Sequence, residues 1–157
     1  MKPIKEKKDT DNKNKRIQYA ALPWRYSKHE GVEILLATSR EKRRWVIPKG
    51  WPMKGRKPHI TAALEAMQEA GLHGKIERKK IGEYTYNKRL KNDLVVPCIV
   101  DVYSLEVFRQ RNKWREQNQR IIHWFPFKIA AAQVDETDLR ELILNFGATK
   151  LVKQTSA

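Results

Sequence analysis

Apolar residues fall into short runs from Ile17 onward, and these runs predict strands and helices in a mixed order. Runs rich in β-branched and aromatic residues predict strands, and a run of helix formers predicts a helix. The predicted strands are residues 17–24, 32–38, 45–47, 76–86, 94–108 and 121–125. The predicted helices are residues 60–70, 127–134 and 136–146, the first with Pro58 in its first turn and Gly71 at its stop. This order is typical of an α+β fold, or of a mixed sheet sandwiched between helices.

The chain is predicted to hold one domain. Its 157 residues are about the length of a single domain, and no internal repeat or Gly/Ser-rich linker divides it. Residues 1–15 are rich in lysine and almost without apolar side chains, which predicts a flexible basic N-terminal arm. We place the domain at residues 16–150 and a C-terminal tail at 151–157.

Charge narrows the class of partner. The 33 basic and 18 acidic residues give a net charge of +15, which favours a polyanion: nucleic acid, an anionic membrane surface or a small molecule crowded with phosphates. No apolar run approaches the roughly 18 residues of a membrane span, and the polar start does not resemble a secretory signal. Cys98 is the single cysteine, which excludes an internal disulfide and a cysteine-built zinc site. We therefore expect a cytoplasmic protein that does not cross a membrane.

The helix 60–70 carries a pair of carboxylates. At about 100° per residue, Ile60, Leu64 and Met67 share an apolar sector that is expected to face the core. Glu65 and Glu69 lie one turn apart on a different side, where two like charges repel unless a cation lies between them. By spacing alone, an ordinary solvated polar face is the more common explanation of such a pair, since charged helix faces are ordinary.

The segment before this helix is strongly basic. Between residues 40 and 57 the only acidic residue is Glu41, whereas the basic residues are Arg40, Lys42, Arg43, Arg44, Lys49, Lys54, Arg56 and Lys57. Positive charge beside paired carboxylates suits a site in which carboxylates hold Mg²⁺ and the basic groups hold phosphates.

The segment from Gly50 to Arg56, followed by the segment from Leu64 to Leu72, resembles the Nudix box, G-x5-E-x7-R-E-U-x-E-E-x-G-U, where U is a bulky apolar residue. The positions that match are Gly50, Glu65, Glu69, Gly71 and Leu72, and Ala66 occupies the first U position. The positions that depart are Arg56, Leu64 and Gln68, where the pattern has Glu, Arg and Glu. The resemblance covers residues 17–147 and implies a Nudix-type α/β/α sandwich with a mixed β-sheet.

Within this superfamily the chain looks most like the diphosphoinositol polyphosphate phosphohydrolase-like branch. The likeness lies in Ser39-Arg40, in the turn Trp45-Val46-Ile47-Pro48-Lys49-Gly50, and in Arg120. It implies hydrolysis of a diphosphate linkage in an inositol pyrophosphate or a dinucleoside polyphosphate. RNA 5′-end pyrophosphohydrolysis and binding of polyphosphate or nucleic acid without cleavage stay open as alternatives.

The resemblance also implies roles for individual residues. Glu69 and Glu65 would hold Mg²⁺ or Mn²⁺ and deprotonate the attacking water, Gln68 would act through a water, and Gly50 would contribute its backbone. Glu106 or Glu116 could supply an additional carboxylate, although an ordinary surface glutamate is the simpler interpretation of each. The residues expected to contact substrate are Ser39, Arg40, Arg44, Lys49, Trp51, Lys54, Arg56 and Arg120.

Overall fold

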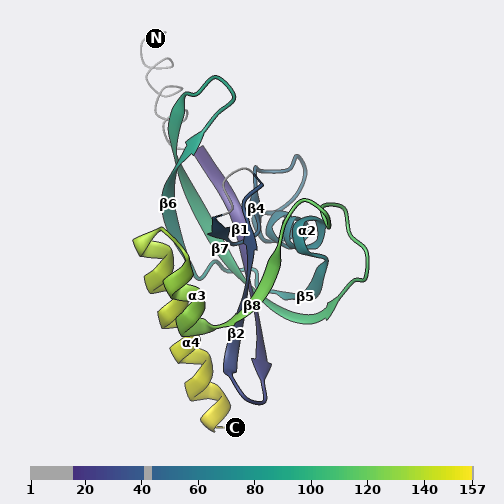
Figure 1. Ribbon diagram of the computed structural model, residues 1–157, viewed down its shortest axis with the longest axis vertical. Helices are drawn as coiled ribbons and strands as arrows, with labels where there is room; N and C mark the ends of the chain where they lie inside the picture. Colours follow the sequence, from purple (N-terminus) through teal and green to yellow (C-terminus); the bar gives the residue numbers. More distant parts are fainter. Residues whose placement is uncertain (1–15, 41–43, 157) are drawn as a thin grey trace.

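The computed structural model describes residues 16–40 and 44–156, so the predicted basic arm, Lys42 and Arg43 lie outside it. Eight strands and three helices occupy this part of the chain (Figure 1). The strands are β1 (Arg16–Ser27), β2 (Gly31–Thr38), β3 (Trp45–Val46), β4 (Lys49–Gly50), β5 (Leu72–Ile76), β6 (Gly82–Arg89), β7 (Val95–Gln110) and β8 (Ile122–Pro126). The helices are α2 (Pro58–Ala70), α3 (Phe127–Gln133) and α4 (Thr137–Ser156).

A mixed sheet forms the centre of the domain. β1 lies between β2 and β7, pairing antiparallel with the first and parallel with the second. β7 also pairs with β5 and β6 along different parts of its length, and β2 pairs with β3 and β8. Because β1 also receives the short strand β4, the sheet carries the Lys49-Gly50 turn directly beside its central strand.

Helices cover both faces of this sheet and create two cores. Ala20, Leu22 and Trp24 of β1 face the core under α3 and α4, whereas Ala21 faces the core under α2. β2 divides in the same way, with Ile34 and Leu36 on one face and Leu35 on the other. Successive side chains of a strand point to opposite faces, so strands that are apolar on both faces require helices on both sides. The predicted α+β sandwich with a mixed sheet is therefore the observed architecture (Figure 1).

Several element boundaries differ from the predicted ones, and three of the differences change the description of the fold. The predicted strand 76–86 begins only at Gly82, whereas residues 72–76, of which only Ile76 was predicted as strand, form β5. The segment 77–81 connects β5 to β6, and the two pair with separate stretches of β7. Lys49 and Gly50, predicted as loop, pair with β1 as β4. The final helix continues past residue 146 to Ser156, into the segment predicted as a tail, because Leu151 packs against the core under α4.

The predicted inner face of α2 is wrong. Ile60, Leu64 and Met67 are only half-buried. The buried residues of the helix are Thr61, Ala62, Ala66, Glu69 and Ala70. Small side chains let α2 approach the sheet closely, so the contact is made by an alanine stripe rather than by the larger apolar residues. As a result Glu69 is 4% exposed and lies at the edge of this stripe, not on a solvated face.

Gly147 offers a test of the packing between α3 and α4. A Cβ at this position would overlap the ring of Phe127. Gly147→Ala should therefore destabilise the protein by about 1–3 kcal/mol through overpacking, although alanine favours a helix more than glycine does. The change is read from urea denaturation. Asn145→Ala, at an exposed position of the same helix, should leave the midpoint unchanged or raise it, and a raised midpoint for Gly147→Ala would contradict the packing.

Candidate active site

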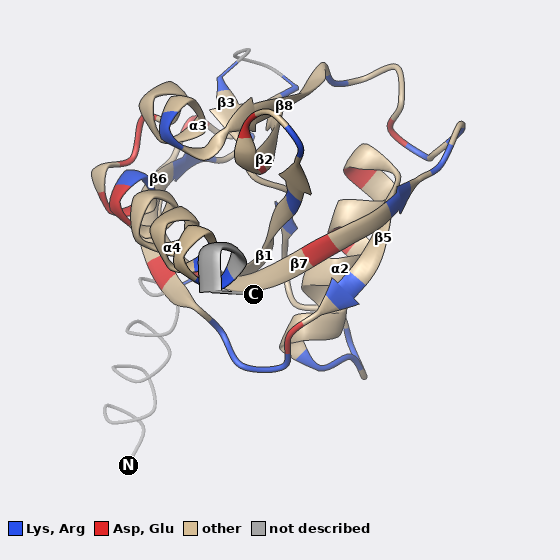
Figure 2. Ribbon diagram, turned by 90° about the horizontal axis from the view of Figure 1, so that it is seen from below, with Lys and Arg blue, Asp and Glu red and all other residues tan. Residues whose placement is uncertain are grey.

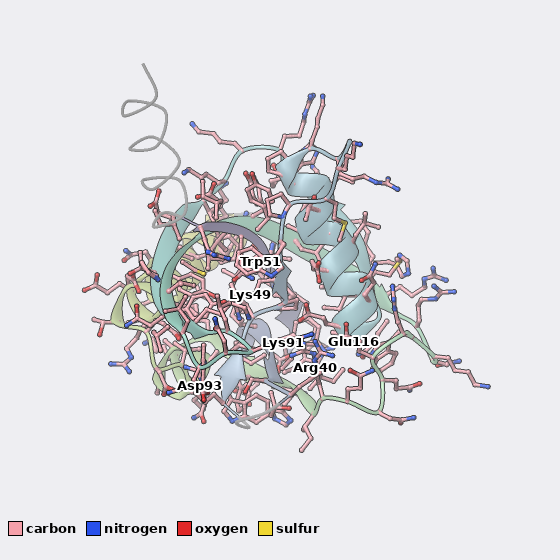
Figure 3. The ribbon with its side chains drawn as sticks, turned by 90° about the horizontal axis from the view of Figure 1, so that it is seen from above. Arg40, Lys49, Trp51, Lys91, Asp93 and Glu116 are labelled. Carbon is pink, nitrogen blue, oxygen red and sulfur yellow. The ribbon has the colours of Figure 1, made fainter. Side chains whose placement is uncertain are left out.

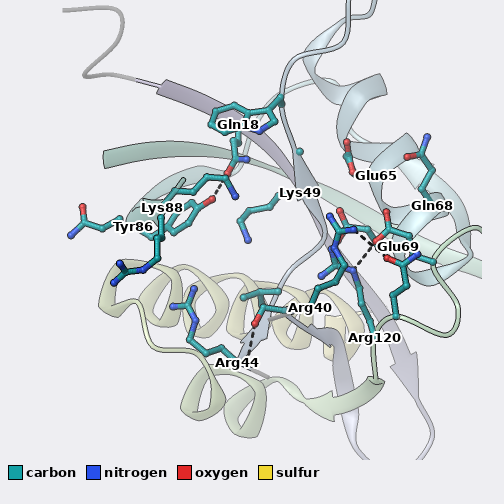
Figure 4. Close-up of a pocket in the computed structure, with 18 of the residues that line it drawn as sticks. Gln18, Arg40, Arg44, Lys49, Glu65, Gln68, Glu69, Tyr86, Lys88 and Arg120 are labelled. Carbon is teal, nitrogen blue, oxygen red and sulfur yellow. Dashed lines mark hydrogen bonds and ion pairs between the residues drawn. The ribbon is translucent and has the colours of Figure 1, made fainter. Parts of the chain in front are cut away.

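A cavity of about 840 Å³ opens beside α2, between the β4 turn and the hairpin of β6 and β7 (Figure 4). Seven parts of the chain line it: β1, the β2–β3 connection, β3, β4 with Trp51, α2, the β6–β7 hairpin and the connection from β7 to β8. Figure 3 looks into this region, with Lys49 and Trp51 near its centre and Glu116 and the hairpin residue Asp93 on opposite sides. Its lining residues are almost all polar or charged, as expected for a charged ligand.

Gly50 lets the Glu65 carboxylate lie against the backbone of β4. A Cβ on Gly50 would overlap the Glu65 carboxylate, so any larger residue here would displace that side chain. The carboxyl groups of Glu65 and Glu69 lie within hydrogen-bonding contact of each other. The predicted pair of carboxylates is thus brought together at the wall of the cavity.

Burial has the largest effect on the pKa of the Glu69 carboxyl group. Removal from water raises the pKa of this carboxyl well above its usual range, while the nearby Arg120 guanidinium acts in the opposite direction. Burial also raises the pKa of Glu65, and the contact with Glu69 lowers it. Two partly desolvated carboxyl groups in contact tend to share a proton, which a divalent cation would displace.

The connection from β7 to β8 is fastened to the C-terminal end of α2. Gly71 adopts a left-handed conformation (φ 70°) and ends the helix, and Trp114 packs on it with ring atom Cε3 only 2.5 Å from where a Cβ would stand. Trp114 Nε1 donates to the carbonyl of Glu69 at 3.2 Å, and the Glu116 N–H donates to the carbonyl of Gln68 at 3.0 Å. These contacts place Glu116 and Arg120 beside the acidic pair.

Arg120 joins three parts of the site. Its Nε lies 3.0 Å from Glu116 Oε1, its Nη2 lies 3.8 Å from Glu69 Oε1, and its Nη1 donates to the Thr38 carbonyl at 3.0 Å (Figure 4). Its side chain is 11% exposed. Arg40 comes from the same end of β2 and donates to Gln119 at 3.2 Å.

Lys49 points into the middle of the cavity, between the acidic end and the hairpin (Figure 4). Burial lowers the pKa of its ammonium to about 8, and the negative charges of Glu69 and Glu136 limit the decrease. Its Nζ lies 5.0 Å from the centre of the Tyr86 ring, and the Tyr86 hydroxyl donates to Gln18 Oε1 at 2.5 Å. On the rim, Lys88 Nζ lies 5.8 Å from the Trp51 ring, which is 38% exposed.

Most of the residues predicted for the site line one cavity. They are Ser39, Arg40, Arg44, Lys49, Gly50, Trp51, Glu65, Gln68, Glu69 and Arg120. Lys54 and Arg56 are exposed in the turn before α2 and do not line it. Of the two candidates for an additional carboxylate, Glu116 lines the cavity and Glu106 does not.

Sequence reasoning missed the hairpin side of the cavity, where Gln18, Tyr86, Asn87, Lys88, Arg89 and Val95 lie. Tyr86 and Lys88 alternate along β6, a spacing that places both on one face of the strand. That spacing predicts a shared face, but it does not show that the face lines the cavity. The pairing of β6 with β7, which cannot be read from spacing, decides it.

The residues present fit a divalent cation. Glu65 and Glu69 offer carboxylate oxygens in mutual contact, and Gly50 brings backbone into the same place because it has no Cβ. Oxygen ligands of this kind are those that Mg²⁺ and Mn²⁺ prefer. Gln68 is half-buried, also lines the cavity, and adds a neutral amide oxygen.

Basic and acidic residues lie on different elements of the fold at β5 and α2. Figure 2 shows basic segments on β5 and near the end of β7, with acidic residues on α2. Within residues 16–40 and 44–156, no helix is long and apolar enough to span a bilayer.

Comparison with known proteins gives one remote curated relative. No protein-family model matches the sequence. Nudix hydrolase 21, chloroplastic, from Arabidopsis thaliana is 28% identical over 111 residues, which are 64% of this chain and 55% of the relative. The chain therefore spans about half the length of that relative.

Solved structures agree over more of the chain. A Caenorhabditis elegans Ap4A hydrolase binary complex superposes with a TM-score of 0.63 at 18% identity, covering 85% of this chain and 96% of its own. The NUDIX domain of Shewanella oneidensis NrtR complexed with ADP ribose superposes with a TM-score of 0.62 at 13% identity, covering 83% of this chain and 87% of its own. A NUDIX hydrolase from Nitrosomonas europaea superposes with a TM-score of 0.64 at 15% identity, covering 86% of this chain and 90% of its own. The chain therefore has the fold of the Nudix hydrolases.

Proposed function

We propose that this protein is a Mg²⁺- or Mn²⁺-dependent pyrophosphohydrolase that cleaves a diphosphate linkage in a highly phosphorylated small molecule. The observation that carries the proposal is the Glu65–Glu69 pair, with Glu65 against Gly50, at the wall of a cavity that is also lined by Arg40, Arg44 and Lys49. The Nudix fold and the relative named a Nudix hydrolase support the same reaction class.

The cavity suits an anion larger than a single phosphate. Its volume of about 840 Å³ lies in the range of sites for whole small molecules. Cationic side chains line it from Arg120 to Lys88, with Lys49 between them. An inositol pyrophosphate or a dinucleoside polyphosphate matches this distribution, and the neighbour described as an Ap4A hydrolase makes the second a natural first substrate to test.

One group of residues in the site would hold the cation and accept the proton, and another would contact the phosphates. Glu65, Glu69 and the Gly50 backbone would hold the cation, which supplies Lewis acidity to the phosphoryl oxygens and to the attacking water. The Glu65–Glu69 pair would accept the proton that the attacking water loses, because its carboxylates lie at the wall of the cavity, beside the place where the cation would be held. Lys49 and the arginines of the β2–β3 connection pair with phosphate oxygens and orient the linkage.

A second candidate is binding of a polyphosphate without cleavage. Gln68 favours it, because it places a neutral amide where a third carboxylate would stand on the same side of α2. The two functions separate in one experiment, in which Mg²⁺-dependent phosphate release is measured from an inositol pyrophosphate, a dinucleoside hexaphosphate, an oxidised nucleotide and 5′-triphosphate RNA. Release from the first or second supports our proposal, and release only from RNA supports 5′-end trimming. Binding of every ligand without release supports the non-catalytic function.

Glu69→Gln should abolish turnover. The substitution keeps the size of the side chain but removes the negative charge that holds the cation and accepts the proton. We expect kcat to fall by on the order of 10²–10⁴, and the circular dichroism spectrum to stay that of the wild type. Glu77→Gln is the matched control, since this glutamate is exposed and lies outside the cavity. Turnover by Glu69→Gln at the control rate would refute the assignment.

Gln68→Glu should tighten metal binding. A third carboxylate at this position adds negative charge to the wall formed by Glu65 and Glu69. We expect the Mg²⁺ concentration for half-maximal turnover to decrease by roughly tenfold, in line with the effect of residues that surround metal ligands. Gln117→Glu, one residue beyond Glu116 but outside the cavity lining, is the control. An identical metal titration for Gln68→Glu and wild type would place residue 68 outside the site.

A further inference from the structure

Arg120 is a buried cation whose donors are directed at the protein. Each of its three nitrogens has a partner: Glu116 at 3.0 Å, the Thr38 carbonyl at 3.0 Å and Glu69 at 3.8 Å. The partners themselves are fixed, because the Glu116 N–H donates to Gln68 and the side chain of Thr38 accepts from the N–H of Ile121 at 2.9 Å. A guanidinium whose donors are engaged by the protein in this way holds those partner groups in place, and it has little freedom to move toward a ligand.

The α2 helix itself offers no cation to Glu69. Leu64 and Gln68 are separated by four residues, so they are neighbours on the helix surface. At these two positions the Nudix pattern has an arginine and a glutamate, and this chain has replaced both members of that pair together. The buried Glu69 therefore takes its cationic contact from outside the helix, and Arg120 supplies it, with Nη2 3.8 Å from Glu69 Oε1.

We propose that Arg120 is a positioning residue that holds the Glu69 carboxylate in its orientation for the reaction, rather than a contact to the substrate. The connection from β7 to β8 delivers it, and Trp114 sets that connection on the end of α2. Glu116 then serves as the partner that keeps Arg120 in place. This inference rests on the proposed function, and it revises the role that the sequence predicts for Arg120.

The two roles differ in which kinetic constant they affect. Loss of a substrate contact raises KM and weakens binding of an unreactive analogue, whereas loss of a positioning group lowers kcat and leaves binding alone. We would compare wild type, Arg120→Met and Arg120→Lys in Mg²⁺ on the best substrate of the panel. Binding of methylenediphosphonate, measured by calorimetry, gives a readout that needs no turnover. Lys113→Met is the control, since Lys113 is exposed on the same connection and outside the cavity.

A double variant that moves the positive charge from position 120 to α2 makes the test specific. In Arg120→Met/Leu64→Arg the guanidinium returns to α2 itself, and Arg120→Lys keeps a charge but loses the planar fork that reaches three partners. If Arg120→Met does not fold, Arg120→Lys with and without Leu64→Arg supports the same comparison.

We expect kcat of Arg120→Met to fall at least 30-fold. KM and the methylenediphosphonate Kd of this variant should stay within about threefold of wild type. Adding Leu64→Arg to Arg120→Met should recover at least a third of the lost activity on a logarithmic scale. Unchanged kcat, a parallel rise in KM and Kd, or no recovery would overturn the inference while the wild-type activity stands. Absence of both turnover and Mg²⁺-dependent ligand binding in the wild type would instead refute the proposed function, and the inference with it.

Discussion

The contact between the Glu65 carboxylate and the backbone of Gly50 is the constraint on which the site depends. It brings a helix residue against a two-residue strand, and it works because that strand is fixed to the central strand β1 through Tyr19 and Ala20. The alanine stripe of α2 allows the helix to lie close enough to the sheet for the contact to form. Two carboxyl groups are thereby held together in partial burial, an unfavourable arrangement that a cation would relieve.

Cationic side chains reduce the electrostatic cost of burying the Glu65 and Glu69 carboxyl groups, and they continue along the cavity away from the pair. Arg120 and Lys49 approach the acidic pair from two different elements, and both influence the pKa of Glu69. Further cations extend along the cavity toward the hairpin, where Lys88 lies beside Trp51. A ligand with negative charge at several points would meet positive charge along its length and the acidic pair at one end.

Much of the fold could be predicted from the sequence, because its strands and helices follow strong local patterns. The stretch 58–70 begins at a proline and ends at a glycine with positive φ, so its bounds were predictable, and the pattern of the box located Glu65 and Glu69. The inner face of α2 was not, because hydrophobic periodicity weighs leucine above alanine, whereas close packing on a sheet selects small residues. The separation of β5 from β6 and the hairpin side of the cavity were also beyond local patterns, since both follow from pairing with distant parts of β7.

The central claim is that Glu65 and Glu69 bind a divalent cation against Gly50. The most direct measurement is a crystal structure of the protein soaked in Mn²⁺, with diffraction recorded at the manganese absorption edge. The account predicts an anomalous peak between the two carboxylates, within about 2.0–2.3 Å of oxygen atoms from both. An ordered site without such a peak, at Mn²⁺ concentrations that saturate known carboxylate sites, would contradict it.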